Sequence, residues 1–195
     1  MTEKAARLMA DRLAGMGQIQ GEDVELYALG IEVILSSAVT AAAVMILGIF
    51  LRNWKGALAF LLCFMHIRNY SGGYHASTRG RCFFTSIGCY MGSLLLSGWI
   101  AAQTGPIRIA AAFLSLGASL WIFYRMAPVE NKNKRLSGNW KQKNRSRTFW
   151  SLGFWAALAG IFAVTDRCLS EQIIAVILII ALLLLNVRRD NHEES

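Results

Sequence analysis

Long apolar runs separated by short polar segments dominate the hydrophobic pattern of the chain. The first clear run, from about Leu26 to Leu51, is long enough to cross a hydrocarbon core of roughly 30 Å at about 1.5 Å per residue. Further apolar runs occupy residues 83–103, 107–127, 149–165 and 172–187. Each predicts a membrane-spanning helix, and the Gly105-Pro106 pair between the second and the third favours a tight turn.

One apolar stretch is shorter than the others. GALAFLLCFMHI, residues 56–67, supplies only about 18 Å of helix, well short of a full crossing. This stretch predicts either a span that stops early inside the protein or a re-entrant element.

The first 20 residues place apolar and charged side chains on opposite sides of a helix. The apolar side holds Leu8, Met9, Leu13 and Met16, and the other holds Lys4, Arg7 and Asp11. Such a helix suits the membrane interface, and an ordinary helix docked on the bundle is the alternative.

Together these patterns predict an all-α integral membrane protein. It should have about six membrane helices, one of them short or re-entrant, preceded by an amphipathic interfacial helix. We expect one membrane domain, with the interfacial helix in residues 1–25, the bundle in 26–187 and a cytoplasmic tail in 188–195.

Composition and charge agree with the membrane class. Of the 195 residues, 55% are hydrophobic and 16% are charged, whereas soluble domains are usually richer in charge. The net charge of +8 does not indicate nucleic acid, because the basic residues cluster in short loops beside apolar spans.

The strongest basic cluster lies between Glu130 and Thr148 and contains no acidic residue. Its members are Lys132, Lys134, Arg135, Lys141, Lys143, Arg145 and Arg147. With six crossings, the positive-inside rule places this loop, both termini and the segment around residues 68–82 in the cytoplasm. The loops at 52–55, 104–106 and 166–171 would face out, and Arg52 and Lys55 are the exceptions to the charge bias.

The segment RNYSGGYHASTRGRC, residues 68–82, is unusually polar for this chain. Most of the four cysteines are expected to be small buried hydrophobes, but Cys82 ends this segment, close in sequence to Arg79 and Arg81. Nearby positive charges stabilise a thiolate, which is the nucleophilic form of cysteine. Cys82 is therefore the candidate nucleophile, although Arg79 and Arg81 also fit a role as membrane anchors.

His75 is the candidate general base, since a cysteine and a nearby histidine are the minimal set for covalent acyl transfer. The two residues are seven apart, and a straight helix would separate their backbones by about 10.5 Å, too far for a hydrogen bond. We therefore expect a bend between them, at Gly80 or at the Gly72-Gly73 pair, whose exposed amides would also stabilise an oxyanion.

Two further residues are candidates for supporting roles. Arg68 would bind a substrate carboxylate or polarise a carbonyl, or else anchor the helix end. Glu32 is the only carboxylate well inside a predicted span. It would either orient His75 as a third member of the site or pair with an arginine between helices.

A zinc site is the alternative chemistry for this region. Cys63, His66, His75 and Cys82 would have to converge, and Cys63 and His66 share a helical face. The spacing matches no standard zinc module, and His66 would serve equally to bond a neighbouring helix. We therefore expect neither a metal nor another cofactor.

The polar segment resembles the accessory gene regulator B (AgrB) family of membrane endopeptidases. The resemblance lies in an arginine followed by Gly-Gly-Tyr-His and, seven residues after the histidine, a cysteine. YALGIE at the start of the first span and MAPVENKNK before the basic loop extend it, so that it covers residues 22–187.

The resemblance implies a cysteine peptidase of Gram-positive bacteria that cuts a small AgrD-like precursor peptide and helps close a thiolactone or lactone quorum-sensing signal. His75 and Cys82 match the catalytic pair, and Arg68 and Gly73 match motif positions linked to activity. Glu32 matches a position that often holds a carboxylate or an amide. The precursors have an acidic C-terminal part, which the basic loop would attract unless it is a topology signal alone.

The expected partners are the precursor peptide, the lipid bilayer of the bacterial cell membrane and a second copy of the chain. The homodimer follows from small-residue stretches such as AVTAAAV and AALAG, which permit close helix packing. Two other function classes stay open: a small proton-coupled transporter using Glu32 and His66, and a structural membrane scaffold.

Overall fold

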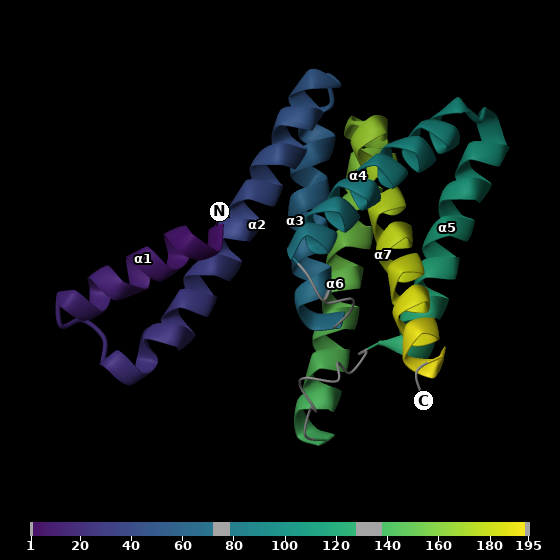
Figure 1. Ribbon diagram of the computed structural model, residues 1–195. Coiled ribbons are helices and arrows are strands. Elements are labelled where there is room, and N and C mark those ends of the chain that lie inside the picture. Colours follow the sequence, from purple (N-terminus) through teal and green to yellow (C-terminus); the bar gives the residue numbers. More distant parts are fainter. Residues whose placement is uncertain (1, 72–78, 128–137, 194–195) are drawn as a thin grey trace.

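The computed structural model describes residues 2–71, 79–127 and 138–193, and this part of the chain consists of helices and short connections (Figure 1). The elements are α1 (Thr2–Gly15), η1 (Gly21–Asp23), α2 (Val24–Phe50), α3 (Trp54–Ser71), α4 (Arg79–Ala102), α5 (Gly105–Met126), α6 (Gly138–Thr165) and α7 (Arg167–Glu193). No strand occurs in these ranges, and the predicted all-α integral membrane class is confirmed.

Five of these helices, α2, α4, α5, α6 and α7, are long and apolar enough to cross a membrane. α3 is not one of these five; it has 18 residues and a length of about 27 Å. It is longer than residues 56–67 predicted, because it starts at Trp54 and the polar residues after Ile67 continue it to Ser71. It is one continuous helix packed against α2, α6 and α7, and its role as a short span or a re-entrant element stays a prediction.

The boundaries of α6 and α7 differ from the predicted spans. α6 starts at Gly138, since lysine, arginine and glutamine are good helix formers and extend the apolar span towards its N-terminus. α7 starts at Arg167, where the Asp166 side chain accepts a hydrogen bond from the Leu169 amide at 3.2 Å and so caps the first turn.

α7 forms the centre of the bundle (Figure 1). It packs against α3, α4, α5 and α6. Of its apolar membrane-spanning stretch 61% is buried within the protein, compared with 11% for the corresponding stretches of α2 and α5. The rest of the described chain therefore leaves most of the surface of α2 and α5 uncovered. α4 crosses the bundle obliquely, in contact with α2, α5 and α7.

Three consecutive residues near the start of α7 bond to three different helices. Ser170 Oγ donates to the carbonyl of Ala159 in α6 at 2.8 Å, and Glu171 pairs with Arg108 in α5. Gln172 bonds to Ser93 and Ser97 in α4, with both distances at 2.8 Å. Glu171, one residue before the predicted span 172–187, is thus a buried carboxylate in the first turns of α7, and Arg108 balances its charge.

α1 folds back along the N-terminal half of α2 (Figure 1). Ala6 and Ala10 are fully buried, whereas Leu8 and Met9 are more than half exposed. α1 is thus a helix with an uncovered apolar side, as an interfacial helix requires, and its placement in a membrane stays a prediction.

The connections α2–α3, α4–α5 and α6–α7 lie together at one end of the bundle, which we call the turn end (Figure 1). In the α4–α5 connection Gly105 has a φ of 54° and Pro106 stands in the first turn of α5, so the predicted tight turn is present. The N-terminal end of α2 and the C-terminus lie at the opposite end.

Candidate functional site

Cys82 is the fourth residue of α4 and is partly buried. Ser86 Oγ donates a hydrogen bond to the Cys82 carbonyl at 3.0 Å, which fixes the local backbone. α4 is described from Arg79 onward, directly after residues 72–78, which lie outside the described ranges, so Cys82 stands beside the boundary of the described part of the chain.

The other half of the predicted pair, His75, lies outside the described residues, as do Gly72 and Gly73. Gly80, in contrast, lies within α4, so the expected bend does not occur there. Gly80 adopts the helical conformation as part of α4, which continues without interruption into a long apolar span.

Arg68 lies near the C-terminal end of α3. Its guanidinium stacks over the Phe64 ring, 5.3 Å from the centroid, and lies close enough to the Cys89 thiol for an electrostatic interaction. Cys89 follows Cys82 by seven residues, about two helical turns, and so shares its side of α4. Arg68 of α3 therefore interacts with the side of α4 that also carries Cys82, about two turns away along that helix.

Glu32 is buried, with 4% of its surface exposed, although its neighbours Val33 and Ile34 are 59% and 70% exposed. The Glu32 carboxylate is thus buried within the protein on a turn of α2 whose next two side chains are exposed. Whether Glu32 orients His75 concerns a residue outside the described ranges.

The face of α4 that begins at Cys82 carries three buried serines among core residues. At helical spacing it holds Cys82, Ser86, Cys89, Tyr90, Ser93 and Ser97. Ser93 and Ser97 bond both to their own helix and to Gln172 of α7. Sequence reasoning missed this face and Gln172, although the serine spacing of seven and four residues carries the signal.

His66 connects α3 to α6. Trp155 Nε1–H donates to His66 Nδ1 at 3.0 Å, and Ser151 Oγ lies 3.1 Å from the same nitrogen. This is the helix-bonding role that the sequence left open. Among the described residues, no group of three or more His, Cys, Asp or Glu side chains is arranged to hold a metal, and His75 of the zinc alternative lies outside them.

Part of the predicted basic loop is helical. Arg145 and Arg147 lie on α6, where Arg145 stacks over Tyr124 of α5 at 5.3 Å and Arg147 over Tyr70 of α3 at 5.8 Å. Residues 128–137 are outside the described ranges. The cationic groups of α6 are thus held against aromatic rings of two neighbouring helices.

Comparison with known proteins gives a family for the chain. The family model Accessory gene regulator B (AgrB) matches residues 3–187. AgrB-like protein 2 of Clostridium perfringens strain 13 is 23% identical over 203 residues, covering 92% of this chain and 95% of that protein. An AgrB-like protein of C. perfringens strain SM101 is 23% identical over 149 residues, covering 75% of this chain and 70% of its own length. No solved structure gives a significant match.

Proposed function

The chain belongs to the accessory gene regulator B family, which associates it with the agr quorum-sensing system, and from this premise we propose that it is a membrane-embedded cysteine endopeptidase. Its substrate is an AgrD-like precursor peptide, its nucleophile is Cys82 and its general base is His75. Arg68, Gly72, Gly73 and Glu32 support the site. The observation that carries this proposal is the family match over residues 3–187, together with a partly buried Cys82 at the end of the polar segment.

The first half of the reaction forms a thioester. His75 takes the proton of the Cys82 thiol, and Sγ attacks the carbonyl carbon of the scissile peptide bond. The C–N bond then breaks, His75 gives the proton to the departing amine, and the C-terminal part of the precursor leaves. The N-terminal part stays on Cys82 as an acyl group.

The second half closes the ring. A cysteine or serine inside the bound peptide attacks the thioester carbonyl, its proton passes to His75, and the Cys82 thiol is restored. The product is a thiolactone or a lactone, with no net consumption of water. Exclusion of water from a membrane-embedded site favours this cyclisation over hydrolysis.

Backbone amides beside Cys82 are the proposed donors for the oxyanion of each tetrahedral intermediate. Arg68, near the C-terminal end of α3, is the proposed partner for a carbonyl or carboxylate of the peptide. In this proposal the site opens to the cytoplasm, both termini are cytoplasmic and the chain acts as a homodimer.

Cleavage of a co-expressed precursor tests the proposal, with cysteine variants that the chain itself provides as controls. Cys82→Ala and His75→Ala should each abolish cleavage while the protein still inserts in the membrane. Cys89→Ala removes a thiol from the same face of α4, and Cys168→Ala removes an exposed thiol elsewhere; both should retain cleavage.

The thioester gives a second, independent measurement. Mass spectrometry of the wild-type enzyme after rapid denaturation should find the acyl group on the peptide that contains Cys82. Cleavage that survives Cys82→Ala, or an acyl group on Cys89 or Cys168, would refute the assignment. Flux of a substrate that persists in Cys82→Ala would favour a transporter.

A further inference from the structure

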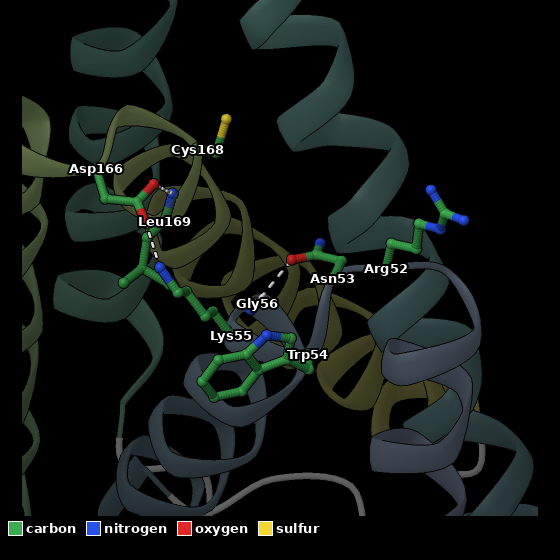
Figure 2. Close-up of a pocket in the computed structure, with 8 residues that line it drawn as sticks. All are labelled: Arg52, Asn53, Trp54, Lys55, Gly56, Asp166, Cys168 and Leu169. Atoms are coloured by element: carbon green, nitrogen blue, oxygen red, sulfur yellow. Dashed lines mark hydrogen bonds and ion pairs between the residues drawn. The ribbon is translucent and has the colours of Figure 1, made fainter.

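A pocket of about 260 Å³ opens at the turn end of the bundle, between the α2–α3 and α6–α7 connections (Figure 2). Its lining residues are Arg52, Asn53, Trp54, Lys55, Gly56, Asp166, Cys168 and Leu169. Neither the peptidase proposal nor the family comparison assigns this pocket a role.

The pocket has an excess of positive charge. Lys55 Nζ lies 3.5 Å from Asp166 Oδ2, and the other oxygen of that carboxylate accepts the Leu169 amide, so Asp166 is engaged on both sides. Arg52 stands apart from this pair, beyond Asn53 (Figure 2). Since Asp166 is the one acid among the lining residues, the pocket lacks an anion to balance Arg52.

The backbone at Arg52 is unusual as well. Its φ is 54°, in the left-handed region that glycine adopts without steric cost and that other side chains seldom adopt. The neighbouring Asn53 side chain accepts the Gly56 amide at 3.1 Å and caps α3. The turn therefore does not need arginine for its geometry.

The pocket lies where α2 and α3 meet the boundary of the hydrocarbon. Phe50, the last residue of α2, is 82% exposed, and Trp54, the first of α3, is 52% exposed. Tryptophan is enriched at the level of the lipid headgroups, where it presents an apolar ring and a polar edge. Anionic phosphates are thus abundant at the depth of the pocket.

We propose that this pocket binds the phosphate of an anionic phospholipid headgroup. Arg52 at the rim of the pocket donates to the phosphate oxygens, Trp54 packs against the glycerol and upper acyl chain, and Lys55 stays paired with Asp166. Basic pockets between membrane helices recognise headgroups by this combination of charge and an apolar neighbour. The inference is independent of the peptidase proposal, because it involves no residue of the Cys82 face.

Lipid-dependent thermal unfolding of the purified full-length protein tests the proposal. In mixed micelles, phosphatidylglycerol should raise the unfolding midpoint above the value in phosphatidylcholine. Arg52→Gly removes the charge but suits the left-handed backbone, so it should fold normally and bind phosphatidylglycerol about tenfold more weakly. Arg52→Lys should retain most of the effect.

A matched control separates the pocket from general charge attraction, since the chain carries a net charge of +8. Arg12→Gln removes one exposed charge from α1 and should keep the wild-type response. Equal responses of Arg52→Gly and wild type would overturn the proposal, as would an equal loss in Arg12→Gln. Inorganic phosphate that cancels the effect of phosphatidylglycerol would show that the pocket takes free phosphate instead. If Arg52→Gly does not fold, Arg52→Gln gives the same comparison.

Discussion

The indole of Trp155 in α6 donates its hydrogen bond to Nδ1 of His66 in α3. Because an indole N–H is a donor only, Nδ1 must be the acceptor and the imidazole proton lies on Nε2. Ser151 approaches the same nitrogen from one turn earlier in α6. One lone pair of His66 is thus used to join two helices, and it is not free to pass a proton along a path through the membrane.

His66→Ala and Trp155→Phe should each reduce stability modestly and leave cleavage in place. His66→Ala leaves the indole N–H without its acceptor, and Trp155→Phe removes the donor. Interhelical hydrogen bonds in membrane proteins couple by about 0.6 kcal/mol on average, so the double mutant should lose less than the sum of the single losses by about that amount. A cleavage assay beside thermal unfolding checks both parts; loss of cleavage in a fully folded His66→Ala would contradict the structural role.

Gly48→Ala should destabilise the bundle by about 1–3 kcal/mol. A Cβ at Gly48 would overlap Cβ of Ala57 in α3, and a side chain that short cannot swing aside without moving its helix. Gly88→Ala in α4 is the matched control, because a Cβ there meets nothing within 4 Å. It should be neutral or stabilise the helix by up to about 1 kcal/mol. Equal effects of the two changes on the unfolding midpoint would show that α2 and α3 do not meet at Gly48.

Glu171→Leu should cost about 3 kcal/mol, because it leaves Arg108 as an uncompensated charge between α5 and α7. The Glu171 side chain is 8% exposed and that of Arg108 is 28% exposed, so water only partly relieves the arginine. Replacing both residues, as in Arg108→Met with Glu171→Leu, should recover most of the loss. Unfolding midpoints of the three variants measure this, and a double variant no better than Glu171→Leu would mean that the pair has another role.

The membrane class and the approximate spans follow from hydrophobic periodicity, because lipid exposure imposes an apolar surface that is visible in sequence. Helix ends are less visible. α6 extends back to Gly138 through residues that read as a loop, since a basic run is compatible with helix once tertiary contacts hold it. Arg145 and Arg147 obtain such contacts from Tyr124 and Tyr70, which are far away in sequence.

The candidate nucleophile was visible in the sequence because Cys82 ends a polar segment, whereas the surroundings of the site were not. The approach of Arg68 to the face of Cys89, and the bonds from Gln172 to Ser93 and Ser97, join helices distant in the chain. Glu171 was missed for the same reason, because its partner Arg108 lies 63 residues away. In addition, the sequence alone does not distinguish a loop at residues 166–171 from the start of a helix, which the cap at Asp166 defines.

The basic residues before α6 offer a test of how the precursor docks. If they attract its acidic C-terminal part, replacing Lys132, Lys134 and Arg135 together by glutamine should raise KM severalfold at low ionic strength and leave kcat nearly unchanged. The KM of the wild-type enzyme should rise as salt is added, because screening over about 8 Å at physiological ionic strength weakens the attraction between exposed charges. The variant's KM should therefore respond less to salt than that of the wild type. Arg12→Gln, a charge change on α1, is the control and should follow the wild-type salt curve. Unchanged cleavage kinetics of the triple variant at low salt would restrict these lysines and this arginine to setting the membrane topology.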